Sequence, residues 1–319
     1  MSQHQAPDRH TQLNGRADAP SIANGTRATL HGIAVTHLRS SDGATATIAD
    51  HGAHVLSWCP AGGVEALYLS PTSCYGARDA IRGGVPVIFP QFGEQGPGKR
   101  HGFARIRRWA LQSASIEEGA AVARLTLQGR LDDGPSAQVA QGAQNEEGSK
   151  AAEFRLLLEV RLQGATLQLG LTIENTGLAA WSCQAALHTY LRVAALETAR
   201  IEGLQGCAYI DQTAASAVSL QTKTTLDFAT EVDRVYPDAP SSLLLSNGSH
   251  QLGIAQQGFA DTVVWNPGAV KAAALTDLPQ KGYRDFVCIE AAAIARRLAL
   301  APGERWHAIQ RLSVLPRVD

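Results

Sequence analysis

Short apolar–polar alternation recurs through most of this chain, and it limits the possible fold more than any other feature. The clearest case is residues 165–173, where leucine or isoleucine stands at every second position from Leu167 to Ile173. Successive side chains of a strand point to opposite faces, so this period indicates a half-buried antiparallel strand. A hint of helical periodicity occurs only at residues 267–278.

Similar short segments predict strands along the rest of the chain, with turn residues between them. They are residues 33–38, 44–49, 53–58, 66–69, 109–113, 121–127, 154–162, 181–193, 263–265, 286–290, 297–300 and 306–315. Strands that recur throughout a chain with little helix are typical of a large antiparallel β-sandwich. We therefore expect an all-β fold.

Two segments lack this pattern. Residues 1–27 are rich in Ala, Gln, Asn, His and Asp, and we expect a disordered tail there. Residues 132–150 have a similar polar bias and predict a long exposed loop. No internal repeat or break in composition divides the remainder, so residues 28–319 are expected to form a single domain.

Composition narrows the class of protein. A formal net charge of -1 argues against a general nucleic-acid binder. No apolar run approaches the ~20 residues that a membrane span needs, so no membrane partner is expected. Five cysteines without a C-x-x-C pair, and no signal peptide, favour reduced thiols and a cytoplasmic location. P-loop, G-x-S-x-G and zinc-ligand patterns are absent from the sequence, so we expect no metal and no cofactor.

Residues 81–105 hold the densest group of unusual residues. The Gly83-Gly84 pair allows a positive φ, and the prolines at 86 and 90 prevent a regular central strand. The stretch predicts an ordered loop that holds Arg82, Arg100, His101 and Arg105 around one place. A plain connector between strands remains an equal alternative.

The segment 181–193 divides into two faces. One parity is apolar except for Thr189, and the other carries His188 beside Ser, Gln, Tyr and Arg residues. Period-2 geometry therefore places His188 on a polar face, away from the main core. This face is compatible with the floor of a carbohydrate-sized cleft or with an ordinary solvated surface.

Two acidic residues are further candidates. Glu290 ends an apolar strand, where a carboxylate is costly unless it is paired or used in chemistry. A structural ion pair with an arginine would also explain it. Asp233 lies among the charges of residues 231–236, which are also typical of a solvated turn.

Taken together, these segments resemble a known family. RGGVPVIFPQFG, HGFAR, LHTYLRV, EVDRVY, VVWNPG and DFVCIE occur here in the order found in hexose-6-phosphate mutarotases. These enzymes are the glucose-6-phosphate 1-epimerase branch of the aldose 1-epimerase superfamily. The resemblance covers residues 33–315 and implies an antiparallel β-sandwich of the galactose mutarotase type.

The resemblance also implies a catalytic pair, with His188 as general acid and Glu290 as general base. Ring opening needs a base at the anomeric hydroxyl and an acid at the ring oxygen, and closure reverses these roles without a metal or cofactor. We expect opposite charges to favour the ionised form of both residues. Their side chains should face one cleft, a sugar ring's width apart.

The remaining matched positions imply a substrate site. Arg82 and Arg105 correspond to arginines that face the phosphorylated substrate, and an arginine fork suits phosphate oxygens. Asp233 corresponds to an aspartate that contacts sugar hydroxyls. Arg100 replaces a common glutamine and either adds a cation or projects into solvent, and His101 either hydrogen-bonds the sugar or orders the loop.

The sequence thus predicts a monomeric, cofactor-independent enzyme that interconverts the anomers of a small-molecule sugar phosphate, glucose 6-phosphate foremost. One alternative is a mutarotase of unphosphorylated aldoses. Another is a non-catalytic carbohydrate-binding module on the same type of sandwich.

Overall fold

A computed structural model describes residues 21–22, 25–131, 152–247 and 251–315. Most of the predicted tail and the predicted loop at 132–150 lie outside these residues. The fold is built from antiparallel sheets, as the alternating sequence predicts, with one parallel pair between β1 and β7.

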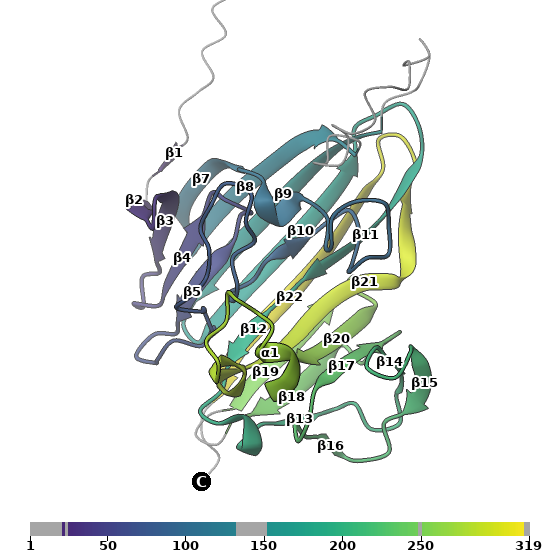
Figure 1. Ribbon diagram of the computed structural model, residues 1–319. Helices are drawn as coiled ribbons and strands as arrows, with labels where there is room; N and C mark the ends of the chain where they lie inside the picture. Colours follow the sequence, from purple (N-terminus) through teal and green to yellow (C-terminus); the bar gives the residue numbers. More distant parts are fainter. Residues whose placement is uncertain (1–20, 23–24, 132–151, 248–250, 316–319) are drawn as a thin grey trace, which may run out of the picture.

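The largest sheet has ten strands and runs the length of the molecule (Figure 1). In spatial order its strands are β1 (Ser21–Ile22), β7 (Ala110–Glu117), β8 (Ala120–Arg130), β9 (Glu153–Gln163), β10 (Thr166–Asn175), β22 (Arg305–Leu315), β19 (Gln251–Gln257), β18 (Ser242–Ser246), β13 (Arg200–Glu202) and β16 (Thr225–Leu226).

An eight-stranded sheet carries Asp233 and Glu290, and His188 lies between two of its strands. Its order is β15 (Ala217–Leu220), β14 (Ala208–Asp211), β17 (Val232–Tyr236), β20 (Asp261–Asn266), β21 (Phe286–Leu300), β11 (Trp181–Leu187) and β6 (Val87–Ile88), with β12 (Tyr190–Arg192) also paired to β21.

A four-stranded sheet and a few short helices complete the described fold. The sheet contains β2 (Gly25–Leu30), β3 (Ile33–Arg39), β4 (Thr45–Ala49) and β5 (Val55–Cys59). The helices are α1 (Gly268–Ala272), within the segment where the sequence hints at helix, and the 3-10 turns η1 (Ala104–Ile106), η3 (Leu196–Thr198) and η4 (Gly282–Asp285). Within the described residues, no helix has the length and apolar character needed to cross a membrane.

The main core lies between the ten-stranded and eight-stranded sheets. Leu158 and Leu169, from β9 and β10, belong to the same buried cluster as Leu187 and Ile289, from β11 and β21. Removing apolar side chains from water is the main favourable term in folding. The apolar residues of each strand therefore face the core, and the residues that alternate with them lie on the outer face of the sheet.

The predicted limit of the tail at Arg27 is wrong. Ser21–Ile22 is a strand, and Arg27 lies within strand β2, which pairs with β3. The Arg27 guanidinium donates to both carboxylate oxygens of Asp50, at 2.7 and 2.6 Å. The partners of the strand pairing and of the ion pair all lie beyond residue 27, so the composition of residues 21–27 does not reveal them.

Candidate active site

Strand pairing in the eight-stranded sheet brings the candidate residues onto one face. Cα partners run across it from Tyr190 to Cys288, from Cys288 to Trp265, and from Trp265 to Asp233. Paired residues share a face, and Glu290 lies two positions beyond Cys288 on the same strand. The sheet register thus places Tyr190, Trp265, Asp233 and Glu290 together.

His188 lies where the predicted strand 181–193 is interrupted. β11 ends at Leu187 and β12 begins at Tyr190, so His188 occupies the junction. Leu187 and Leu191 point into the main core, which confirms the predicted orientation of His188 away from it. The face is not solvated, however, because His188 is 6% exposed and Glu290 is 1% exposed.

His188 and Glu290 are in direct contact. His188 Nε2 lies 3.4 Å from Glu290 Oε1, so the expected separation of a ring's width is wrong. At this distance a proton can pass directly between the imidazole and the carboxyl group.

Each member of the pair also has an unused polar atom. His188 Nδ1 and Glu290 Oε2 are buried and have no hydrogen-bond partner among the described residues. Buried polar atoms in native proteins nearly always have a partner. The site therefore offers a nitrogen and a carboxyl oxygen to a polar ligand.

The electrostatics of the pair differ from our expectation. Burial lowers the pKa of His188 well below its ordinary value, and the nearby guanidinium groups of Arg105 and Arg82 lower it further. Burial also raises the pKa of Glu290 well above its ordinary value, with a contribution from the carboxylate of Asp233. Desolvation outweighs mutual attraction, so both residues favour their neutral forms before a ligand binds.

Aromatic rings fix the imidazole of His188. The Tyr190 ring stacks on it with centroids 4.8 Å apart and planes 9° apart. The Trp265 ring meets it edge-on at 5.8 Å. Tyr190 and Trp265 are site residues beyond those predicted, although the sequence carries a signal for both. Tyr190 shares the parity of His188, and Trp265 belongs to the VVWNPG motif.

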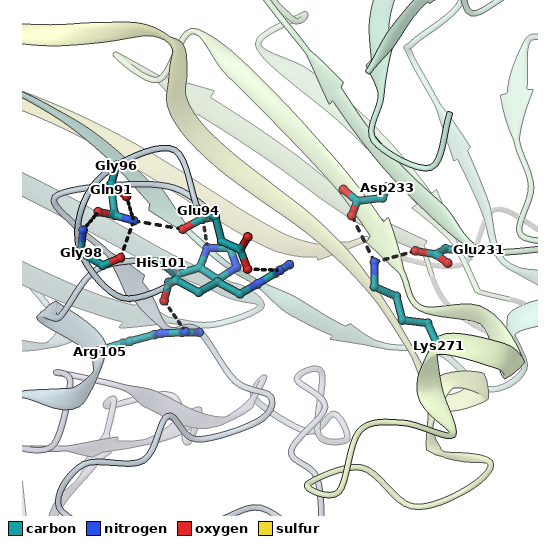
Figure 2. A network of polar contacts seen from close by, with 11 residues as sticks. Gln91, Glu94, Gly96, Gly98, His101, Arg105, Glu231, Asp233 and Lys271 are labelled. Carbon is teal, nitrogen blue, oxygen red and sulfur yellow. Dashed lines mark hydrogen bonds and ion pairs between the residues drawn. The ribbon is translucent and has the colours of Figure 1, made fainter. Parts of the chain in front are cut away.

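His101 approaches the pair from the segment 81–105, where the sequence predicts an ordered loop. Its backbone has a φ of 62°, its Nδ1 accepts a hydrogen bond from the Gly93 N–H at 3.2 Å, and its ring lies 5.5 Å from that of His188. The Gln91 side chain ties the loop by accepting from the Gly98 N–H and donating to carbonyls of the same loop (Figure 2). His101 therefore orders the loop as well as facing the site.

Arg105 has an unused donor beside this loop. Its Nη2 donates to the Arg100 carbonyl at 2.8 Å, while its Nε is buried and has no partner among the described residues (Figure 2). Burial lowers the pKa of Arg105 to about 10, and the nearby charges of Arg82 and Arg100 contribute. A cluster of cations with a free buried donor is suited to an anion.

Arg82 is already held by groups of the protein. Its Nε and Nη2 lie 3.1 and 3.0 Å from Asp277 Oδ2, and its Nη1 donates to the Tyr190 hydroxyl at 3.0 Å. The sequence does not predict Asp277 as a site residue, because no local pattern links it to Arg82, almost two hundred positions earlier. Arg82 keeps its charge but has a resident anionic partner.

The other two predicted residues lie at the margins. The Arg100 side chain is 57% exposed, and its Nη1 is 3.7 Å from Glu94 Oε1. Asp233 lies 3.7 Å from Lys271 Nζ, which also contacts Glu231 at 2.7 Å (Figure 2). Burial raises the pKa of Asp233. The structure thus gathers all the predicted residues in one region, with Arg100 the most exposed.

Known proteins resemble this chain over most of its length. The family model described as aldose 1-epimerase matches residues 35–313. A protein of Cenchrus ciliaris, provisionally named a glucose-6-phosphate 1-epimerase, is 31% identical over 294 residues, which span 90% of this chain and 87% of that protein.

Solved structures share the fold. One from Salmonella typhimurium, described provisionally as a mutarotase, superimposes with a TM-score of 0.79 at 25% identity and covers 92% of this chain and 94% of its own. A galactose mutarotase-like protein from Clostridium acetobutylicum gives a TM-score of 0.65 at 13% identity, with coverage of 92% and 98%. The expected sandwich of the galactose mutarotase type is therefore confirmed.

Proposed function

The chain belongs to the aldose 1-epimerase family, and from this premise we propose that it interconverts the α and β anomers of a hexose 6-phosphate, with glucose 6-phosphate as the first choice. The observation that carries the proposal is the buried contact of 3.4 Å between His188 and Glu290. A non-catalytic sugar-binding module has no need for such a pair, and isolating two titratable groups from water is costly.

The pair can run the reaction in both directions. Glu290 takes the proton of the anomeric hydroxyl while His188 protonates the ring oxygen, the bond between C1 and the ring oxygen breaks, and the aldehyde forms. Rotation about C1–C2 and the reverse transfers close the ring as the other anomer. The protein regains both of its protonation states, so the cycle consumes nothing.

Substrate binding would bring the pair into the charged forms that this mechanism requires. The neutral pair and the ion pair hold the same number of protons, so one transfer between Nε2 and Oε1 converts them. A sugar hydroxyl that donates to Glu290 Oε2 would favour the carboxylate. A phosphate beside Arg105 and Arg82 would offset the positive charge that lowers the pKa of His188.

The phosphate assignment is supported by the cationic side of the site. The unpartnered Nε of Arg105 offers a hydrogen-bond donor, and the positive charge of Arg100 is close enough to affect the pKa of Arg105. The name of the relative from Cenchrus ciliaris agrees with a phosphorylated sugar. Binding energy from a remote phosphate can position the reacting end of the sugar.

A direct test follows the anomerisation of freshly dissolved α-glucose 6-phosphate by NMR. The wild type should exceed the spontaneous rate, and His188→Ala and Glu290→Gln should each lose about 10²- to 10⁴-fold in kcat, the usual range for a general acid or base. If both variants keep the wild-type rate, the catalytic assignment is wrong.

Unphosphorylated aldoses are a second candidate substrate class. The observation in their favour is the ion pair of Arg82 with Asp277, which already satisfies one expected phosphate ligand. Comparing kcat/KM for glucose and glucose 6-phosphate decides between the two classes. Equal values would remove the phosphate from the proposal and leave the acid/base pair intact.

A further inference from the structure

A buried polar contact in the main core lies directly behind the His188–Glu290 pair. Gln310 on β22 is fully buried, and its inward-facing neighbours on that strand, Ala308 and Leu312, belong to the apolar core. A buried amide is costly unless it is fully hydrogen-bonded. The partners of Gln310 therefore indicate what its side chain does.

Those partners adjoin both members of the acid/base pair. Gln310 Oε1 accepts from Thr189 Oγ1 at 2.5 Å, and Gln310 Nε2 donates to the Ile289 carbonyl at 3.1 Å. Thr189 follows His188 in the chain, and Ile289 precedes Glu290. The Ile289 N–H also donates to the Thr189 carbonyl at 3.1 Å, which closes the link.

We propose that Gln310 is a positioning residue that sets the separation of His188 from Glu290. It reaches across the core from the ten-stranded sheet and bonds the Thr189 side chain next to His188 and the Ile289 backbone next to Glu290. It also explains why Thr189 is the polar exception on an apolar strand face. The effect on catalysis rests on the proposed function, whereas the effect on the separation does not.

The strand junction explains why such a link is needed. The register is the same on both sides of the junction, because Leu187 pairs with Ala291 and Tyr190 pairs with Cys288, but regular pairing lapses at residues 188 and 189. The Thr189 carbonyl still accepts from the Ile289 N–H, but the His188 N–H donates to the Pro86 carbonyl and the Thr189 N–H donates to the Leu187 carbonyl, each at 3.0 Å. A misplacement of about 1 Å can cost about 10²-fold in rate.

The test begins with Gln310→Met, which keeps the side-chain length and removes both hydrogen bonds. We expect kcat for α-glucose 6-phosphate to fall about 10- to 100-fold, with KM unchanged within about twofold. Thr189→Val should lose less, because Gln310 still holds Ile289. Unchanged kcat in Gln310→Met would overturn the proposal.

Gln310→Glu adds a readout that a merely structural role would not give. A protonated glutamic acid can accept from Thr189 and donate to Ile289, whereas a carboxylate cannot donate. This variant should keep more of its kcat than Gln310→Met at low pH and lose that advantage as the pH rises. A constant ratio between the two variants at all pH values would contradict the proposal.

The matched control is Leu312→Ala. Leu312 lies on the same strand and in the same core, but its side chain forms no hydrogen bond to residue 189 or 289. It should lower the thermal midpoint at least as much as Gln310→Met and keep the kcat of the folded protein. An equal loss of kcat in both variants would reduce Gln310 to an ordinary core residue.

A crystal structure of Gln310→Met separates this inference from the proposed function. The distance from His188 Nε2 to Glu290 Oε1 should change relative to the wild type, and an unchanged distance would overturn the positioning role. If the wild type does not accelerate anomerisation, the proposed function fails, and this distance still tests the inference.

Discussion

The protonation of Glu290 is set by its burial, and this links its chemistry to stability. The carboxyl has a raised pKa in the folded protein and a lower one in the unfolded chain. Above the unfolded pKa, the unfolded chain therefore releases a proton that the folded protein retains. The contribution of Glu290 to stability consequently falls as the pH rises from about 4.3 through the folded pKa, by about 1.4 kcal/mol per pH unit.

Glu290→Gln should remove this loss of stability while lowering kcat about 10²- to 10⁴-fold. At pH 7–8 the variant should be more stable than the wild type by at least about 1 kcal/mol, and the difference should vanish near pH 4. Urea unfolding at several pH values measures it. Glu118→Gln, at a side chain that is 93% exposed, is the control and should shift stability by less than about 0.5 kcal/mol. A less stable Glu290→Gln at pH 8 would contradict the argument.

Arg105 should distinguish phosphorylated from unphosphorylated sugars. A hydrogen bond to a charged group contributes about 1.5–3 kcal/mol, so Arg105→Ala should lower kcat/KM for glucose 6-phosphate about 10- to 150-fold. Its kcat/KM for glucose should change little. The control is Arg108→Ala, at a side chain that is 79% exposed and paired with Asp50. Equal losses for both sugars would show that Arg105 supports the site without contacting the phosphate.

At the scale of elements, the loop over residues 89–105 depends on backbone that only glycine adopts readily. Gly102 has a φ of 67°, and a Cβ there would lie 2.1 Å from the Phe89 carbonyl oxygen. Gly93 has a φ of 54°, but a Cβ there would meet nothing within 4 Å. Substitution at Gly93 therefore introduces backbone strain alone, whereas substitution at Gly102 adds a steric clash.

Gly102→Ala should displace the loop and weaken substrate binding, with KM for glucose 6-phosphate raised about 10-fold or more. Gly93→Ala should cost about 1–2 kcal/mol of stability for its left-handed backbone and leave KM nearly unchanged. Thermal unfolding and steady-state kinetics on both variants provide the comparison. Matching KM values would mean that the position of His101 does not depend on this close approach.

The sequence predicts those features of the strands that depend on contacts within the strand itself. Alternation placed the strands and the orientation of His188, because period 2 is a property of the strand itself. It did not predict the interruption after Leu187, because the contacts at that junction come from Gln310 and Pro86 in other elements. The sheet register that brings Asp233 beside Trp265 is likewise a pairing between strands.

For the whole molecule, the all-β sandwich followed from the sequence, but the state of its site did not. The motifs located the charged residues, whereas the ion pair of Arg82 with Asp277 joins segments far apart in the chain. The neutral forms of His188 and Glu290 result from burial, which depends on everything packed around them. The motifs therefore identify the titratable side chains of the site, and the packing of the complete fold sets their protonation states.

The same burial of neutral histidines should govern the response of the whole molecule to acid. His54 on the turn before β5 is fully buried, its Nε2 lies 2.7 Å from the Gly83 carbonyl oxygen, and burial lowers its pKa to about 3. His101 and His188 also have lowered pKa values. Below pH 6.5 these histidines gain protons in the unfolded chain but not in the folded protein, so their contribution to stability decreases as the pH falls.

His54 alone should remove roughly 4–5 kcal/mol between pH 6.5 and 3, at about 1.4 kcal/mol per pH unit, against the 5–15 kcal/mol typical of a whole domain. Urea unfolding between pH 7 and 4 measures this loss. The Gln side chain of His54→Gln can still donate to the Gly83 carbonyl, but it does not titrate. The free energy of unfolding of this variant should therefore fall less steeply with acid, by up to about 1.4 kcal/mol per pH unit. Parallel curves for the two proteins would mean that His54 becomes protonated without unfolding.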